Sequence, residues 1–401
     1  MVACRVCDAS LDRASLFTIP APLVSAFPRD ATTPRVSAPI EVVGCGSCGH
    51  VQPRHSVDPA HLYSEYWYLS GVNERMRQEL LTIVQQAQQR VEIDRDDAVL
   101  DIGANDGTLL AQYPPWVQKV AVEPAATFAE KLSGGWVTHV AGLFPQCVAQ
   151  IPDRFYKVIS TVAMFYDLDD PVRAAQVIRR FLHPQGVWIC QFQDLEQQVR
   201  AGAWDNTVHE HVSYYTLHTF NEVVRRAGLQ VSDVEMTTIN GGSLRVYVTH
   251  PHAHFPTTRV QEQYFREFQT LEGPWAARFQ RRMRRNVAQL RAMIASVTGQ
   301  GGTLDLYGAS TKGNTLLQVL DLPAGTIRQA WERNPAKVGR LTVTGVPIVD
   351  EASGRADPPD ALLTSIWQFR SEIIARERET LKTVPLILPL PEATWVGTWK
   401  T

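Results

Sequence analysis

Short apolar runs alternate with helical patterns through the middle of the chain. The runs that predict β-strands lie near residues 98–102, 119–123, 156–161 and 186–193. Apolar positions at helical spacing predict one helix over residues 72–92. A second helix is expected to begin at Asp170-Pro171, because an acidic N-cap before a proline is typical of a helix start. Strands that alternate with helices indicate an α/β fold with a parallel sheet.

Two later apolar runs predict a hairpin that closes this sheet. They extend from Leu229 to Ile239 and from Leu244 to Thr249, with the turn Asn240-Gly241-Gly242 between them. Residues 259–297 then carry a helical, arginine-rich pattern that Gly273-Pro274 interrupts. This long polar helix separates the first α/β unit from the C-terminal third of the chain.

A second α/β unit begins at Leu304, where a strand runs into the loop Gly308-Ala-Ser-Thr-Lys-Gly-Asn314 and then into a helix from Thr315 to Leu320. A further helix is expected from Phe369 to about Leu381. Later strands are expected near residues 327–331, 346–349, 361–366 and 385–390. We therefore expect a small N-terminal lobe over residues 1–70, a central α/β domain over 71–255 and a second, Rossmann-like domain over 256–401.

Composition restricts the class of protein further. The 401 residues are 44% hydrophobic and 20% charged, as in ordinary globular chains. A net charge of −2 and a pI near 6.6 argue against a nucleic-acid partner, because phosphate backbones need a basic surface. No run approaches the ~18 apolar residues of a membrane span, and the N-terminus lacks a signal-peptide core. We expect a cytoplasmic protein, without a membrane partner, that is a monomer or a small homo-oligomer.

Four of the six cysteines form two Cys-x-x-Cys pairs, Cys4 with Cys7 and Cys45 with Cys48. Two such pairs supply four thiolates in a tetrahedron, the arrangement that zinc prefers in structural sites. A closed four-cysteine site leaves no open position for a substrate, so we predict a structural zinc. A redox disulfide is the alternative, and the presence of a second pair disfavours it.

The run Val-Leu-Asp-Ile-Gly-Ala-Asn-Asp-Gly-Thr, residues 99–108, predicts a ligand-binding loop. A strand ends in Asp101 and turns through two glycines into a helix, and Glu123 ends the next strand, where a carboxylate binds a ribose diol. The glycine spacing does not fit a dinucleotide, and the acids Asp101 and Asp106 lie where a pyrophosphate needs free N–H groups. An ordinary α/β turn without a ligand is the weaker alternative.

A cationic ligand that has a ribose and no phosphate fits this loop better, so the run predicts S-adenosylmethionine. The run resembles the first motif of class I methyltransferases, whose outline also includes a parallel sheet closed by a late hairpin. The side chains after the strand near 156–161 are expected to face the same cofactor. The residues predicted to surround it are Asp101, Gly103, Asn105, Asp106, Gly107, Glu123, Pro124, Met164 and Phe165.

Catalytic groups are expected in residues 205–215, which come after the strand near 186–193. His209 and His211 flank Glu210 there, and histidine is the natural general base near neutral pH. The two histidines are two positions apart, which does not match the spacing of a helical zinc motif. The alternative is a polar surface loop, or buried histidines that hydrogen bonds satisfy.

Two other segments carry candidate chemistry. The aromatic segment from Tyr63 to Gly71 is interpreted as a lid over the cofactor, or else as an anchor between lobes. The loop 308–314 carries hydroxyls and Lys312 before a helix, a combination that suits a phosphate.

Taken together, these motifs resemble the sugar C-methyltransferase family of the deoxysugar and surface-polysaccharide pathways. The resemblance covers nearly the whole chain. The motifs that occur in family order are the four cysteines, the loop at 99–108, His209-Glu-His211, the loop 308–314, Asn334-Pro-Ala-Lys337, Pro347-Ile348 and Pro389-Leu-Pro391.

The resemblance implies an enzyme that methylates the carbon next to a ketone in a nucleotide-linked keto-deoxysugar. A base removes the α-proton, and the enolate takes the methyl group of S-adenosylmethionine; zinc is structural. By resemblance His211 is the base, Glu210 its active-site neighbour, and Tyr66 or Tyr68 the active-site tyrosine. A tyrosine hydroxyl or His209 is expected to donate to the enolate. The residues expected near the substrate are Asp167, Asn240, Lys312, Asn334 and Lys337.

The chain departs from the family at two substrate-contacting positions. Some members have a tyrosine where this chain has Val208, and some have a histidine where it has Asp167. A different sugar, methylated carbon or proton route therefore stays open. The other open hypotheses are a methyltransferase of this architecture that acts on an oxygen or on a non-sugar metabolite, and a non-enzymatic zinc-knuckle binding protein.

Overall fold

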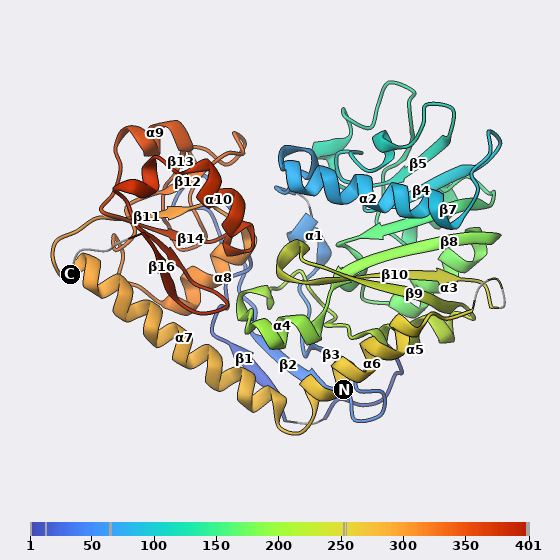
Figure 1. Cartoon of the computed structure of the whole chain (residues 1–401), viewed down its shortest axis with the longest axis horizontal. Coiled ribbons are helices and arrows are strands. Elements are labelled where there is room, and N and C mark those ends of the chain that lie inside the picture. The colour runs from blue at the N-terminus through green and yellow to red at the C-terminus, as the bar shows by residue number, and fades with distance from the viewer. Residues whose placement is uncertain (1, 13, 64–65, 252, 254, 398–401) are drawn as a thin grey trace.

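The computed structural model describes residues 2–12, 14–63, 66–251, 253 and 255–397, which form three β-sheets (Figure 1). A three-stranded antiparallel sheet near the N-terminus has the order β1-β2-β3. The central sheet has the order β6-β5-β4-β7-β8-β10-β9, and the C-terminal sheet has the order β13-β12-β11-β14-β15-β16. Two α/β units and a small separate lobe are expected from the sequence, and all three are present.

The central sheet is parallel except at one edge. Its parallel strands are β4 (Ala98–Ile102), β5 (Gln118–Val122), β6 (Thr138–Val140), β7 (Tyr156–Val162) and β8 (Leu182–Gln193). Strand β10 (Ser243–Thr249) is antiparallel to both of its neighbours, β8 and β9 (Gln230–Thr237). The expected strands and the closing hairpin are confirmed, whereas β6 is an additional strand that the sequence pattern did not predict.

Residues alternate between two cores along the strands of this sheet. In β4, Leu100 and Ile102 join the core that includes α3 (Pro171–Phe181) and α5 (Leu217–Arg226). Val99 faces the opposite way, into the core formed with α2 (Glu74–Arg90). This period of two, with helices on both faces, is the pattern of a sheet buried on both sides.

The helix expected directly after the loop at 99–108 is absent. Gly107 adopts φ 77, and only a short 3-10 turn, η2 (Leu110–Gln112), comes after it. The consecutive residues Pro114 and Pro115 stop any longer helix, because proline removes a backbone donor and restricts the residue before it. A short connection after η2 then leads into β5.

The C-terminal half contains a second parallel sheet with one antiparallel edge. Helices α6 (Thr258–Leu271) and α7 (Trp275–Thr298) lead into it, with the expected break at Gly273-Pro274. Helix α8 begins at Thr311, earlier than expected, because the side chain of Ser310 accepts from Gly313 N and caps the helix. Helix α10 ends at Arg376, earlier than expected. The remaining elements are β11 (Leu304–Tyr307), α8 (Thr311–Leu320), β12 (Ala330–Glu332), β13 (Ile348–Asp350), α9 (Glu351–Ala356), β14 (Ala361–Thr364), α10 (Arg370–Arg376), β15 (Leu386–Leu388) and β16 (Thr394–Val396).

The N-terminal lobe packs on both larger units. Its strands are β1 (Phe17–Ile19), β2 (Ile40–Gly44) and β3 (Val51–Pro53), and α1 (Pro59–Tyr63) comes next. Phe17 packs against Phe279 of α7 with ring centroids 5.2 Å apart, while Cys4 and Val43 belong to the core of the central sheet. Figure 1 shows β1 and β2 beside the end of α7, between the two larger sheets. The lobe therefore fixes the central and C-terminal units relative to each other.

No helix in the described part of the chain has the length and apolar character needed to cross a membrane.

Candidate active site

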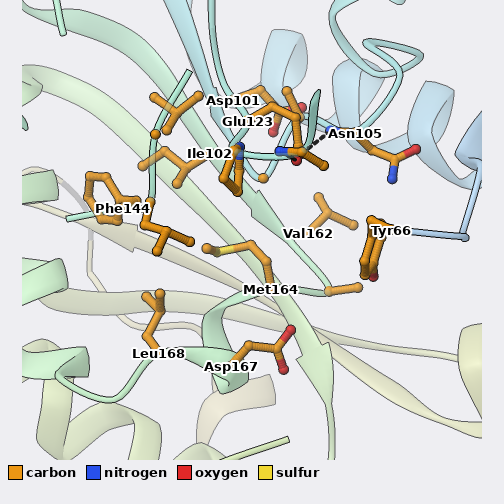
Figure 2. A pocket seen from close by; sticks show the side chains of 18 of the residues that line it. Tyr66, Asp101, Ile102, Asn105, Glu123, Phe144, Val162, Met164, Asp167 and Leu168 are labelled. Carbon is orange, nitrogen blue, oxygen red and sulfur yellow. Dashed lines mark hydrogen bonds between the residues drawn. The ribbon is translucent and has the colours of Figure 1, made fainter. Parts of the chain in front are cut away.

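A cavity of about 300 Å³ lies at the carboxyl ends of the central parallel strands (Figure 2). Open α/β sheets place their ligands at this edge. The loops after β4, β5, β6 and β7 line the cavity, and α2 and the segment before it contribute Met76, Tyr66 and Tyr68. The predicted residues that line it are Tyr66, Tyr68, Asp101, Gly103, Asn105, Glu123, Pro124, Met164 and Asp167.

Glu123, directly after β5, connects this strand to the loop after β4 by hydrogen bonds. Its carboxylate accepts hydrogen bonds from Asn105 N (2.8 Å) and Ala125 N (2.9 Å). Burial raises the pKa of Glu123, and these two N–H groups act against that rise. Gly103 has φ 75, and a Cβ there would lie 2.8 Å from Met164 Cγ, so only glycine keeps this wall open. A fixed carboxylate beside a glycine turn fits the ribose of a nucleoside ligand.

Asp101 provides a second carboxylate at the same wall. Ser160 Oγ donates to its Oδ1 at 2.6 Å, and burial raises the pKa of Asp101 to about 7. An ionisable group in such an environment is stabilised in its charged form by a nearby cation. The sulfonium of S-adenosylmethionine is the kind of cation that suits this cavity.

The loop after β4 also fixes the aromatic segment over the cavity. Asn105 Oδ1 accepts from Ser70 N at 3.0 Å, Asn105 Nδ2 donates to Tyr68 O at 3.0 Å, and Asp106 Oδ2 accepts from Gly71 N at 2.9 Å. Ser64 and Glu65 lie outside the described residues. Tyr66 and Tyr68 line the cavity, which is consistent with a lid.

Three predicted cofactor residues take other positions. Asp106 and Gly107 do not line the cavity: Asp106 holds the aromatic segment, and a Cβ at Gly107 would meet Trp136 and Leu132. Phe165 is fully buried and packs on Trp188 with ring centroids 5.2 Å apart. The neighbouring side chain, Met164, points into the cavity instead (Figure 2).

One wall of the cavity was not predicted from the sequence. Phe144, Pro145 and Gln146 line the cavity from the loop after β6. The sequence signal for this wall is the short run Trp136-Val-Thr-His-Val140, which predicts a strand before the loop with Pro145. Met76 and Leu80 of α2 also line the cavity, because the helix packs over the cofactor edge of the sheet.

The segment with His211 is fixed next to this cavity. Val212 N and Ser213 N both donate to Tyr166 O at 3.0 Å, and Tyr166 precedes Asp167 of the cavity wall. The imidazole of His211 lies 4.4 Å from the ring of Tyr166, centroid to centroid. His211 therefore does not line the cavity itself, but its ring contacts Tyr166, the residue before Asp167 of the cavity wall.

The hydrogen bonds of His211 determine its tautomer. Nδ1 lies 3.0 Å from the carbonyl oxygen of Asn206, so Nδ1 carries the proton and donates. Burial, reinforced by the positive charge of Lys312, lowers the pKa of His211 to about 3. The imidazole is therefore neutral near pH 7, and its Nε2 bears the lone pair that a base needs.

Glu210, Asp167 and Tyr66 lie close enough for the two carboxylates to act on the tyrosine, and Asp167 and Tyr66 both line the cavity. Burial raises the pKa of Glu210 to about 7, and within the described structure its buried Oε2 has no hydrogen-bond partner. Burial also raises the pKa of Tyr66, and the charges of Asp167 and Glu210 add to that rise. The pKa of Tyr68 rises to about 12 through burial and the charge of Asp106. Both tyrosines keep their protons and remain donors near pH 7.

His209 does not belong to this group. Its Nε2 donates to Ala38 O at 2.9 Å, and the side chain is buried against the N-terminal lobe. Its role as an enolate donor is therefore not supported, and the structure gives it an anchoring contact.

The C-terminal candidates fall into two groups. Lys312 Nζ donates to Asn240 O at 2.9 Å, which brings both residues beside the His211 segment. Asn334 Nδ2 donates to Trp67 O at 2.8 Å and Lys337 Nζ to Ala309 O at 2.7 Å. Asn334 and Lys337 are thus buried and engaged with the chain itself, outside the described cavity.

The four cysteines of the N-terminal lobe meet in one place. Their sulfur atoms all lie within 4.8 Å of one another, with Cys4 and Cys48 Sγ at 3.6 Å and Cys7 and Cys45 Sγ at 3.5 Å. Zn–S bonds of about 2.3 Å place the sulfurs of a tetrahedral site about 3.8 Å apart. The geometry therefore fits one structural zinc, and four protein ligands leave it no open position.

Three family models match successive parts of the chain. A zinc-binding domain matches residues 4–63, a methyltransferase domain matches 72–234, and a C-methyltransferase C-terminal domain matches 238–391. C-methyltransferase NovU of Streptomyces niveus is 28% identical over 402 residues, covering 97% of this chain and 95% of that protein.

Solved structures are similar to less than half of the chain. The mitomycin 7-O-methyltransferase MmcR is 18% identical with a TM-score of 0.35, over 46% of this chain and 60% of its own. An S-adenosylmethionine-dependent methyltransferase from Clostridium acetobutylicum is 10% identical with a TM-score of 0.36, over 43% of this chain and 92% of its own.

The central sheet and its cavity define a class I, S-adenosylmethionine-dependent methyltransferase. The three matched domains and the similarity to a C-methyltransferase over nearly the whole chain support an S-adenosylmethionine-dependent C-methyltransferase. The prediction of the fold class, the enzyme class and the two cofactors from the sequence is confirmed.

Removing the metal tests the cysteine site. Chelation is expected to lower the melting temperature of the N-terminal lobe by several degrees, because metal binding is part of its folding free energy. Metal analysis should find one zinc per chain in the wild type and in Cys147→Ser, a buried free cysteine elsewhere, and none in Cys4→Ser. Metal-free protein that melts like the metal-loaded protein would refute the assignment.

Replacing Glu123 tests the ribose position. Glu123→Ala should weaken S-adenosylmethionine binding by about 10- to 100-fold, because a charge-assisted hydrogen bond contributes about 1.5–3 kcal/mol. Titration calorimetry measures the dissociation constant, and Glu130→Ala, an exposed acid after the same strand, is the matched control. An unchanged constant in Glu123→Ala would mean that the ribose binds elsewhere.

Proposed function

We propose that this enzyme methylates the carbon next to the ketone of a nucleotide-linked keto-deoxysugar. The observation that carries the proposal is the neutral imidazole of His211, whose Nε2 is the basic nitrogen and whose ring contacts Tyr166, next to Asp167 of the cavity wall. The family resemblance of the motifs supports the choice of a nucleotide-linked sugar. The match of residues 238–391 to a C-methyltransferase C-terminal domain supports carbon as the methylated atom.

Carbon methylation next to a ketone needs a base for the α-proton and donors for the developing enolate oxygen. His211 is the base, because Asn206 O fixes its tautomer and Nε2 is the acceptor. Tyr66 donates toward the substrate from the cavity wall, since burial keeps its hydroxyl protonated. S-adenosylmethionine, when bound, supplies the electrophilic methyl group.

Glu210 and Asp167 help to keep the hydroxyl of Tyr66 protonated. Their charges act on Tyr66, and burial raises the pKa of Glu210 to about 7. A carboxyl group with that pKa exchanges protons readily near neutrality. Asp167 takes the position at which some relatives have a histidine, and it contacts the sugar.

Replacing His211 tests the proposed base. His211→Ala should leave the affinity for S-adenosylhomocysteine unchanged and lower kcat by about 10²- to 10⁴-fold, the usual contribution of general base catalysis. The wild type, loaded with S-adenosylhomocysteine, should exchange the α-hydrogen of a keto nucleotide sugar with deuterium from solvent, whereas His211→Ala should not.

The control for this experiment is His218→Ala, an exposed histidine on α5. NMR of the product distinguishes a new C–CH₃ group from an O-methyl group. Full turnover in His211→Ala, or a methyl group on oxygen, would contradict the proposal.

A further inference from the structure

Lys312 is one of the residues that connect the C-terminal unit to the central one. It belongs to the first turn of α8, and its Nζ donates to the carbonyl oxygen of Asn240, in the turn between β9 and β10, at 2.9 Å. One of its three N–H groups is used by this bond. The side chain lies deep between the two units and remains partly accessible. The sequence of the loop 308–314 predicts that Lys312 lies near the nucleotide phosphates, but the fold places it beside His211.

The 3-10 turn η6 (Trp204–Asn206) packs against α8 and carries polar groups that lack partners. Asp205 accepts from Trp367 Nε1 at 2.7 Å through Oδ2, whereas its buried Oδ1 has no partner in the described structure. Asn206 is 0% exposed, and both its side-chain Oδ1 and Nδ2 lack a described partner. Buried polar atoms are nearly always hydrogen-bonded, so these atoms indicate a polar ligand.

Charges within this cluster complement one another. Burial lowers the pKa of Lys312 to about 8, and the carboxylate of Asp205 acts against that fall. Near pH 7 the amine therefore carries a proton. The same positive charge faces His211 and disfavours a second cation there.

We propose that the ammonium of Lys312 hydrogen-bonds the substrate ketone and stabilises the enolate oxygen, while Asp205 and Asn206 bind polar groups of the same sugar. This inference rests on the proposed function. The α C–H bond breaks, its proton goes to Nε2 of His211, and its electron pair forms the C=C bond as the carbonyl pair moves to oxygen. The enolate carbon then forms its bond to the methyl group, the carbonyl is restored, and the methyl–sulfur bond breaks with its electron pair left on sulfur.

The positions of the charges make this stabilisation selective for the transition state. Before proton transfer, the positive charge of Lys312 keeps the imidazole of His211 neutral. After transfer, the enolate lies between imidazolium and ammonium and is attracted to both. Interactions that strengthen only as the reaction proceeds raise kcat.

Lys312→Met removes the charge at similar side-chain volume. We expect kcat to fall by at least about 10²-fold with KM little changed, as when one oxyanion donor is lost. Solvent deuterium exchange at the α-carbon should fall in parallel, because enolisation itself is impaired. Lys312→Arg keeps the charge and should recover part of kcat. It should also extend activity to higher pH, since the wild type loses the ammonium above a pH of about 8.

Lys119→Met is the matched control. Lys119 is also buried and donates to a backbone carbonyl, Tyr113 O at 3.0 Å, on β5 outside the cavity. Its replacement should lower the melting temperature comparably and leave kcat unchanged. The probe is thymidine diphosphate 4-keto-6-deoxyglucose, with its uridine counterpart as a second probe.

The outcomes separate the two proposals. If the wild type neither exchanges nor methylates either probe, the proposed substrate class is wrong. If the wild type is active and Lys312→Met exchanges the α-hydrogen as fast, Lys312 only joins the two units and this inference is overturned. Loss of exchange in Lys312→Met with partial recovery in Lys312→Arg supports it.

Discussion

Hydrogen bonds from the central domain and from the N-terminal lobe hold the segment that carries the proposed base, and the site depends on them. Val212 N and Ser213 N donate to Tyr166 O, in the 3-10 turn η5 (Phe165–Asp167) after β7. Tyr214 N bonds to Val51 O at 2.8 Å, and Ser213 Oγ lies 3.2 Å from Nε2 of His50, shortly after the second cysteine pair. The zinc lobe therefore does more than stabilise the N-terminus, because the strand that begins beside its second cysteine pair fixes one side of the active segment.

Burial away from water determines the protonation states of the side chains in and around the same segment. Burial keeps His211 neutral, raises the pKa of Glu210 to about 7 and keeps Tyr66 protonated. In a medium of low dielectric constant, fixed charges such as that of Lys312 act more strongly than they do in water. A small rearrangement of protons among neighbouring groups is therefore enough to favour an enolate. The C-terminal domain takes part in this environment because Lys312 extends from it to the hairpin of the central sheet.

Local patterns predicted most of the fold. The apolar runs that became β4, β5, β7 and β8 are continuous because both faces of the sheet are buried. Strand β6 (Thr138–Val140) is too short to give a clear apolar pattern. The helix predicted after Gly107 is absent because Pro114 and Pro115 stop it. The cysteine tetrad was predictable from spacing, since its ligands come in pairs close in sequence.

The substrate side of the site was harder to predict because tertiary packing creates it. Nothing in the sequence indicates that Lys312 meets a turn 72 residues earlier in the chain, or that Asp205 faces Trp367. A ternary complex with S-adenosylhomocysteine and a keto nucleotide sugar tests the account most directly. We predict sulfur beside Gly103, and the α-carbon about 3–3.5 Å from Nε2 of His211, on the side facing the sulfur. An α-carbon beyond reach of this nitrogen, with another base in contact with it, would contradict the account.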